Sequence, residues 1–357
     1  MQPDNAKPFG ILKIAAAYIG TVVGAGFASG QEVLRFFSAY GLWGVAGVAV
    51  ASVLFFFIGY TILLLGRSLK ASSHVDIVRH TNGALLGTAI DLVVSIFLFG
   101  GLCTMLAGAG AIFREQFALA PLWGTLAMAA VTLLTVLTGT RGVVNAISYV
   151  VPFLIVSVLF ISVKSLLHNP VTADELKAAS ALQGSTPHWL LSAVNYASYN
   201  IVISIGVLAP IGAATEDKKK LLWGALLGAA GLAVGMFAIY FCLLTNITEA
   251  GSLEVPMAAI AQQISPIVRI AFAVVLFAEV YTTAVGNLYA FSQRLSPRLS
   301  RGMVIAVTCA LALVVAQLGF SNMVRFLYPA VGYGGMLFFG GVIYTWLKKR
   351  GSLRTGR

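Results

Sequence analysis

The chain has 357 residues, of which 59% are hydrophobic and only 10% are charged. Soluble domains carry about 25% charged residues, so a mean hydropathy of +0.92 excludes a water-soluble globular protein and makes lipid the solvent for most of its surface. The net charge of +11 does not indicate nucleic acid binding, because the basic residues fall in short segments between apolar runs.

Ten apolar runs are long enough to cross a bilayer, for which roughly 20 residues are needed. They lie near residues 9–37, 42–66, 84–113, 120–139, 142–165, 188–213, 220–246, 266–292, 302–319 and 322–347. Short connections separate them, so the chain is predicted to be an all-α polytopic membrane protein whose residues 1–357 form a single transmembrane domain. With no nucleotide-binding domain in view, any energy coupling is expected to come from an ion gradient.

The charge of the connections alternates along the chain. About 17 of the 23 basic residues fall on one side of the predicted membrane, among them the Lys218–Lys220 run and those of the last ten residues. Basic residues concentrate in cytoplasmic connections, so both termini are predicted to lie in the cytoplasm, with the protein in the cell (inner or plasma) membrane. An even number of spans agrees with this orientation.

Two connections on the opposite side are expected to fold into short helices. Residues Thr172–Glu175 have the spacing of a capping box, in which the first side chain caps a helix. The stretch Met257–Ile264, which follows Pro256, predicts a second helix that is too short to span the membrane. It is expected to be either a lid over the outer mouth or a surface linker.

The first and sixth runs contain residues that weaken a helix at matching places. The first holds four glycines and two hydroxyl residues within Gly20–Gly30, and the sixth holds the polar stretch Ser198–Ser204 and then Pro210. Glycine in a helix interior costs about 1 kcal/mol relative to alanine. Paired interruptions are typical of transporters built from inverted repeats. We therefore predict two five-span repeats, about 9–165 and 188–347, with helices 1 and 6 broken.

An interrupted helix exposes backbone groups inside the membrane, where they need partners. The N–H groups of Gly24, Ala25 and Gly26 would face an anion, with the positive end of the following half-helix behind them. A substrate carboxylate suits this arrangement. The alternative is that the glycines let helices pack closely, as small residues at four-residue spacing do, although packing leaves the second interruption without a cause.

Ionisable and hydroxyl side chains in the eighth run mark a further candidate site. A charge at membrane depth is costly unless it is paired or faces water, so Glu279 is interpreted as a proton carrier or as the neighbour of an ion site. The alternative is a structural pair, either with Arg269 or with a polar group on another helix. The hydroxyls of Thr282 and Thr283 would bind a sodium ion, or would instead bond to their own helix backbone.

Two opposite charges lie on the outer half of the first run. Glu32 and Arg35 are three residues apart, which places them on one helix face. They are expected to form either a gate pair or a simple pair within the helix.

The glycine-rich stretch carries a family resemblance. Gly20–Phe27, GTVVGAGF, resembles the GSIIGSGIF motif of the amino acid–polyamine–organocation carriers. The longer stretch Gly20–Glu32, GTVVGAGFASGQE, is similar to the first helix of YkvI-type bacterial membrane proteins, and Glu254–Ile260 is similar too. The resemblance implies the LeuT-type fold, in which spans 1, 2, 6 and 7 form a bundle that rocks against a scaffold containing spans 3, 4, 8 and 9.

The resemblance also implies a substrate site. The substrate carboxylate would lie on the backbone amides of Val23–Gly26, and Tyr199 and Asn200 would line the pocket from the sixth span. The substrate would be an amino acid or a similar small zwitterionic or carboxylate solute. A divalent metal is not expected, because the first helix lacks the Asp-Pro-Gly-Asn type of sequence that the metal-transporting branch requires.

A sodium site is implied in the same way. Its ligands would be the carbonyls of Gly20 and Val23 and the hydroxyls of Thr282 and Thr283. Two adjacent hydroxyl residues in the eighth span match the pattern of the superfamily.

The choice of coupling ion stays open. Some proton-coupled relatives place a lysine of the fifth span in the sodium position, whereas this fifth run offers Asn145 and Ser148 and has no lysine before Lys164. This favours sodium. Glu279, beside the proposed site, departs from the pattern and keeps a proton as the alternative.

The leading hypothesis is an ion-coupled secondary transporter that works by alternating access, with the lipid bilayer and a small-molecule substrate as partners. No cofactor is expected beyond a sodium ion or proton. The runs hold no cluster of acids, histidines or cysteines for metal or nucleophile chemistry, so the protein is not expected to be an enzyme. The alternatives are a membrane sensor or receptor on a transporter fold without net transport, and a channel. The sequence predicts neither the solute, the stoichiometry nor the oligomeric state.

Overall fold

The computed structural model describes residues 9–71, 74–137, 150–295 and 300–354, which fold into helices without a strand. The first span is divided into α1 (Ile11–Val22), α2 (Ala25–Ala28) and α3 (Gln31–Phe36). The long helices that follow are α4 (Trp43–Leu69), α5 (His74–Phe117), α6 (Pro121–Leu137), α8 (Val150–His168), α10 (Trp189–Ala213), α11 (Lys218–Leu244), α14 (Pro266–Leu295), α15 (Arg301–Ala316) and α17 (Tyr328–Arg354). The short elements are η1 (Ser38–Tyr40), α9 (Ala173–Ala181), α12 (Ile247–Ala250), α13 (Pro256–Ile264), α16 (Phe320–Asn322) and the π-helical η2 (Met323–Leu327).

The helices match the predicted spans. Within the described residues, six helices are long and apolar enough to cross a membrane, and four shorter apolar helices occupy the remaining predicted positions. The prediction of a polytopic all-α membrane protein is confirmed. The beginning of the fifth predicted run, with Asn145 and Ser148, lies outside the described residues.

The predicted interruption of the first span is confirmed. α1 ends at Val22, and the backbone is extended at Val23 (φ −74°, ψ 110°) and at Gly24 (φ −133°, ψ −173°) before α2 begins. A second turn follows at Gly30, whose φ of +85° suits a residue without a Cβ atom. Here an added Cβ would also press on the side chain of Met257 at the start of α13.

The predicted interruption of the sixth span is wrong. α10 is continuous through the polar stretch and through Pro210, which lies near its end. The Asn200 side chain donates to the carbonyl of Tyr196 (3.1 Å), and the Ser204 hydroxyl donates to the carbonyl of Asn200 (2.8 Å). These polar side chains therefore bond to their own helix backbone, and they do not require the helix to open.

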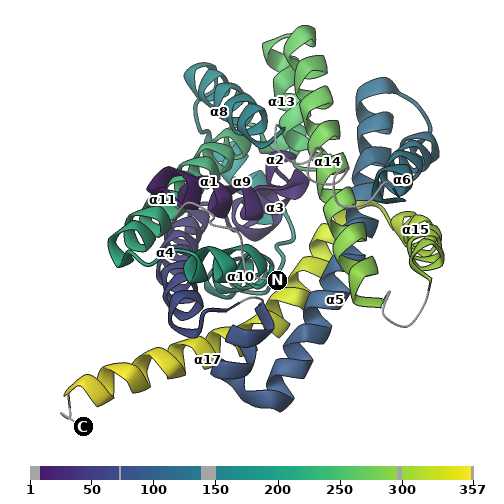
Figure 1. Ribbon diagram of the computed structural model, residues 1–357. Coiled ribbons are helices and arrows are strands. Elements are labelled where there is room, and N and C mark those ends of the chain that lie inside the picture. Colours follow the sequence, from purple (N-terminus) through teal and green to yellow (C-terminus); the bar gives the residue numbers. More distant parts are fainter. Residues whose placement is uncertain (1–8, 72–73, 138–149, 296–299, 355–357) are drawn as a thin grey trace.

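The long helices form the two groups that the resemblance implies. α1, α4, α10 and α11 pack against one another, and α5, α6, α14 and α15 form the other group. Figure 1 shows the first group around the purple broken helix and the second group beside it. α8 contacts both groups through α11 and α14, and α17 does so through α10 and α5.

An ion cluster joins α5 to α14. α5 begins at His74, before the predicted third span, and bends at Gly83, where φ is +75°. The Asp91 carboxylate lies 2.9 Å from the Arg294 guanidinium and 3.0 Å from the His74 ring. Arg294 also donates to the Ser95 hydroxyl at 2.8 Å. These bonds link the two central helices of the second group.

Both short helices predicted for the connections are present. The Thr172 side chain accepts a hydrogen bond from the backbone N–H of Glu175 (3.2 Å), as a helix cap does, at the start of α9. α13 begins at Pro256 and packs on α14 and α8, and the N–H of Met257 donates to the carbonyl of Ser29 at 3.0 Å. α13 is therefore a packed part of the domain rather than a surface linker, and its role as a lid stays a prediction.

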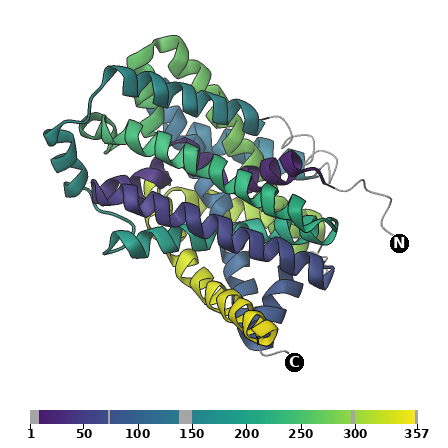
Figure 2. The same ribbon diagram turned by 90° about the vertical axis from the view of Figure 1, so that its left-hand side faces the viewer.

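The chain begins and ends at one end of the helix bundle. Figure 2 shows the start of α1 and the end of α17 at the same end, with α9 at the other. We call these the terminal end and the α9 end. This arrangement agrees with an even number of spans, and the membrane orientation stays a prediction.

Close backbone contact between α4 and α10 depends on two glycines. A Cβ atom at Gly66 would overlap the backbone of Ala209, and one at Gly212 would overlap the backbone of Leu63. We expect Gly66→Ala and Gly212→Ala each to lower the free energy of unfolding by about 1–3 kcal/mol, the usual range for overpacking. The check is the melting temperature of the purified protein in detergent. Gly302→Ala, where nothing lies within 4 Å of the added Cβ, is the control, and equal melting of all three variants would contradict this close crossing.

Candidate substrate and ion site

A cavity of about 210 Å³ lies where the first span is broken. Its walls come from the α1–α2 junction, α3, α5, the middle of α10 and α14, and the first residue of α17. The lining residues are Gly20, Thr21, Val22, Val23, Gly24, Ala25, Gly26, Glu32, Phe97, Gly101, Met105, Tyr199, Asn200, Ile203, Glu279, Thr282, Thr283, Gly286, Asn287 and Tyr328. At this size the cavity suits a solute smaller than the drug-sized ligands that occupy pockets of about 300–1,000 Å³.

Nearly all of the residues predicted for the site meet at this cavity. It is lined by the residues predicted to bind substrate (Val23, Gly24, Ala25, Gly26, Tyr199 and Asn200) and by those predicted to bind sodium (Gly20, Val23, Thr282 and Thr283). Glu279 and Glu32 also line it, whereas Arg35 does not. The fold thus places residues of the first, sixth and eighth spans together, and their individual roles stay predictions.

The break in the first span supplies backbone groups to the cavity. The last carbonyls of a helix and its first N–H groups have no partners within that helix, and α1 and α2 meet here with both kinds. The N–H of Val23 still donates to the carbonyl of Ile19 (2.8 Å), and the N–H of Ala28 donates to the carbonyl of Gly24 (2.9 Å). No atom lies within 4 Å of a Cβ built on Gly24, so this residue borders open space.

Glu279 is buried on the α14 side of the cavity, with 3% of its surface exposed. Its Oε1 lies 3.5 Å from the Thr283 hydroxyl, and its Oε2 has no hydrogen-bond partner within the part of the chain that the structure describes. None of the ion pairs among the described residues includes Glu279, so the alternative of a structural pair with Arg269 is wrong. The Thr282 hydroxyl donates to the carbonyl of Glu279 (3.0 Å), which matches the helix-backbone alternative for that residue.

Glu32 and Arg35 do not form the predicted pair, because the two side chains have other partners. The Tyr199 hydroxyl donates to Oε2 of Glu32 at 2.5 Å, which joins α10 to α3. Arg35 reaches the carbonyl of Gln183 (3.4 Å), in the segment between α9 and α10. A spacing of three residues on one helix face was therefore not sufficient to predict an ion pair between these two side chains.

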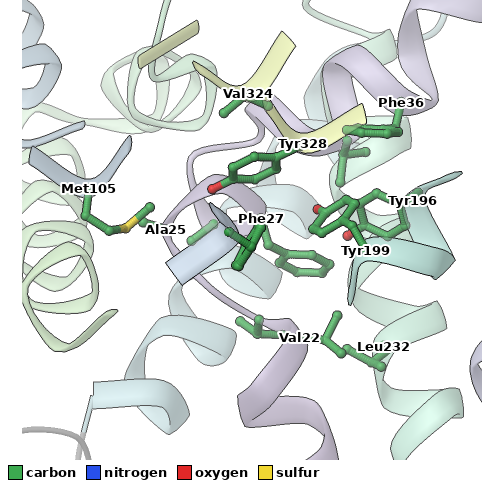
Figure 3. Packing of buried hydrophobic residues seen from close by; sticks show 14 of the residues in the cluster. Val22, Ala25, Phe27, Phe36, Met105, Tyr196, Tyr199, Leu232, Val324 and Tyr328 are labelled. Carbon is green, nitrogen blue, oxygen red and sulfur yellow. The ribbon is translucent and has the colours of Figure 1, made fainter. Parts of the chain in front are cut away.

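Aromatic rings close the cavity on the side toward the α9 end. Tyr199 packs against Tyr328 with ring centroids 5.1 Å apart, and against Tyr196 (5.4 Å), Phe36 (5.6 Å) and Phe97 (6.2 Å). Figure 3 shows the Tyr199, Tyr196, Phe36 and Tyr328 rings gathered on one side of the break and Val22 on the other. Tyr199 and Tyr328 are 1% and 4% exposed.

Toward the terminal end, the cavity face of α10 becomes accessible. Tyr199 and Ile203 line the cavity, and Gly206 and Val207 continue the same helix face at spacings of three and four residues. Gly206 is exposed, with nothing within 4 Å of an added Cβ, and Val207 is 39% exposed. Aromatic rings thus cover the cavity toward the α9 end, and the face of α10 that continues from the cavity is exposed toward the terminal end.

Several lining residues were not singled out from the sequence. Asn287 follows Glu279 and Thr283 at a spacing of four residues, so all three share one face of α14. That spacing was a usable signal for Asn287. Tyr328 and Phe97 carried no such signal, because they reach the cavity only through the packing of α17 and α5 against α10.

The fold and the site together define a polytopic membrane protein of the LeuT-type fold. The structure of MhsT in complex with L-phenylalanine superposes with a TM-score of 0.60 at 18% identity, over 91% of this chain and 87% of that one. A substrate-bound, outward-open Na⁺-coupled sialic acid symporter gives 0.60 at 13% identity over 94% and 79%. A manganese transporter of Eremococcus coleocola gives 0.58 at 14% over 91% and 77%. At these identities the likeness shows the fold alone.

Sequence comparison finds two similar proteins that match this chain over most of its length. The chain is 29% identical to the uncharacterized membrane protein YkvI of Bacillus subtilis (strain 168), over 96% of this chain and 97% of the relative. It is 26% identical to the uncharacterized protein YyaD of the same strain, over 88% and 90%. No known protein-family profile matches the chain. The chain therefore has the LeuT-type fold and is similar to the membrane protein YkvI over nearly its whole length.

The two glycines at the break should respond differently to the same substitution. A Cβ at Gly26 would overlap Oε1 of Glu32, whereas a Cβ at Gly24 meets nothing. We expect Gly26→Ala to displace the Glu32 carboxylate from Tyr199 and to lower the free energy of unfolding by about 1–3 kcal/mol, with Gly24→Ala close to wild type. Thermal unfolding of both variants is the measurement. In a Tyr199→Phe background the cost of Gly26→Ala should shrink, and an undiminished cost there would rule out this explanation.

Proposed function

We propose that this protein is an ion-coupled secondary transporter of an amino acid or a similar small zwitterionic or carboxylate solute. The observation that carries the proposal is the cavity itself, which combines a broken helix with two buried carboxylates, Glu32 and Glu279. The LeuT-type fold of an L-phenylalanine complex and of a Na⁺-coupled symporter supports the same class. The proposed sites for the substrate carboxylate and for the coupling ion rest on the chemical groups that line the cavity in this chain.

The substrate would occupy the side of the cavity next to the break. Freed N–H groups at Gly24–Gly26 offer donors to a carboxylate, and the absence of a side chain at Gly24 leaves room for its approach. Tyr199 and Asn200 border the same space from α10. A carboxylate transferred from water needs such donors to replace its hydration.

The coupling ion would occupy the side formed by α1 and α14. The carbonyls of Gly20 and Val23 and the hydroxyls of Thr282 and Thr283 are oxygen ligands of the kind that hard cations prefer. Glu279 adds a buried carboxylate with one oxygen free of hydrogen bonds within the described residues. The negative charge of Glu279 would balance a sodium ion bound there. If the coupling ion is a proton, the Glu279 carboxylate would bind it.

Alternating access would expose this cavity to each side of the membrane in turn. The Tyr199 and Tyr328 rings cover the cavity toward the α9 end, and the same face of α10 is exposed at Gly206 toward the terminal end. With both termini in the cytoplasm, this would correspond to an inward-facing arrangement. Movement of the α1–α4–α10–α11 group against the scaffold would separate the rings and cover the opposite side.

Uptake into proteoliposomes tests the transport proposal. The purified protein would be reconstituted and supplied with each standard L-amino acid under an inward sodium gradient, an inward proton gradient, or neither. We expect concentrative uptake of one chemical class of amino acid under one of the gradients. Saturable binding without any uptake would instead favour the sensor alternative, and rapid flux without a gradient would favour a channel.

Two substitutions on α14 separate sodium from proton coupling. If sodium binds here, Thr283→Ala removes one ligand, so half-maximal uptake should require about tenfold more sodium, the effect of a loss of ~1.4 kcal/mol. If Glu279 carries the proton instead, Glu279→Gln should remove the dependence of uptake on pH. Uptake by both variants would be measured against sodium concentration and against pH. Wild-type responses from both would exclude this side of the cavity as the coupling site, and Thr248→Ala, far from the cavity in α12, is the control.

A further inference from the structure

Two buried carboxylates in one cavity leave a charge to be balanced. Glu32 comes from α3 and Glu279 from α14, and they are 4% and 3% exposed. Neither takes part in any of the ion pairs among the described residues. A buried ionised carboxylate without a positive partner costs several kcal/mol, so in their ionised forms these two carboxylates need cationic groups in the cavity. One coupling ion accounts for Glu279 but leaves Glu32.

Glu32 is held at the edge of the cavity nearest the break. Its Oε2 accepts the 2.5 Å hydrogen bond from Tyr199, and its Oε1 lies so close to Gly26 that a Cβ atom added there would overlap it. Each carboxylate oxygen accepts more than one hydrogen bond, so Glu32 keeps acceptor capacity beside the Tyr199 bond. The arrangement fixes this carboxylate beside Gly26, in the first turn of the half-helix that follows the break.

Because α10 is continuous, an ammonium group in the cavity needs a side-chain acceptor instead of a backbone carbonyl of α10. An unbroken helix uses its interior carbonyls for its own hydrogen bonds, and α10 runs without interruption past Tyr199, Asn200 and Ile203, its cavity-lining residues. Its backbone therefore offers the cavity no acceptor there. An ammonium group that enters from solvent needs negative or carbonyl oxygens to replace water.

We propose that Glu32 binds the ammonium group of the substrate, while Glu279 serves the coupling ion; this assignment rests on the proposed transport of a zwitterion. The ammonium acceptor lies against Gly26, whose N–H is among the donors for the carboxylate. Acceptor and donors are thus adjacent. This spacing selects solutes whose amine and carboxylate are attached to the same or neighbouring carbon atoms, such as α-amino acids.

Ligand binding to the purified full-length protein tests the assignment. The probes are the standard L-amino acid that most raises the melting temperature of the wild type, its decarboxylated amine, and its deaminated carboxylic acid. We expect Glu32→Gln to weaken binding of the amino acid and the amine about 10- to 100-fold, the range for a hydrogen bond to a charged group. Binding of the deaminated acid should change by less than about threefold.

Matched variants separate ligand binding from a structural role of Glu32. Glu216→Gln, at an exposed position outside the cavity, should leave the affinities for all three probes unchanged. Tyr199→Phe removes the donor to Glu32 but keeps the carboxylate, so any loss of binding it causes should not single out the amine and the amino acid over the deaminated acid. If Glu32 only held α3 to α10, Tyr199→Phe and Glu32→Gln would weaken all three probes alike, and the assignment would be overturned.

The remaining outcomes are also decisive. If an amino acid binds the wild type and Glu32→Gln does not discriminate between amine and acid, this assignment fails while the proposed function stands. If no standard amino acid stabilises the wild type, this assignment fails together with the amino acid part of the proposed function. Should Glu32→Gln not fold, Glu32→Asp keeps the charge but draws it back by one methylene. It should still weaken the amine more than the acid, and equal effects would overturn the assignment.

Discussion

Backbone groups that leave a helix inside a bilayer must find new partners, and the rest of this structure is arranged around one place where they do. Between Val22 and Ala25 the chain is extended, so carbonyls of α1 and N–H groups of α2 meet away from lipid. Surrounding helices enclose this junction, and the cavity forms at it. The α9 end is sealed by aromatic rings, which supply large apolar area without adding polar groups that would themselves need partners.

The two broken helices expected for this fold are reduced here to one. Because α10 stays helical, the polar contribution from its side of the cavity comes from side chains and not from opened backbone. Glu32 and Tyr199 connect α3 to α10 by a buried hydrogen bond, and Glu279 lies on the opposing group of helices. Carboxyl groups from α3 and from the opposing helix group therefore line the same cavity, so a cation bound to both would depend on how the groups sit against each other.

How far the site could be predicted depended on the kind of information each residue carries. The glycine run of Gly20–Gly30 predicted the break correctly, because the cost of glycine in a helix is local. The polar stretch of the sixth span led to the wrong prediction of a break, because the side chains of Asn200 and Ser204 donate hydrogen bonds to carbonyls of their own helix. Glu32 and Arg35 shared a face but not a bond, because neighbouring elements presented Tyr199 to one and Gln183 to the other.

The sequence by itself determined that lipid is the solvent, and it determined the ten spans, the break in the first of them, the capped start of α9 and the short helix that begins at Pro256. These follow from hydropathy, from local helix cost and from capping, none of which needs a distant partner. Only the tertiary structure decided that Tyr328 and Phe97 line the cavity, that α10 remains whole, and that Glu32 lines it without an ion pair to any described residue. The physical reason is that a membrane helix is apolar on nearly every side, so its rotation is set by packing against neighbours rather than by a hydrophobic face readable along the chain.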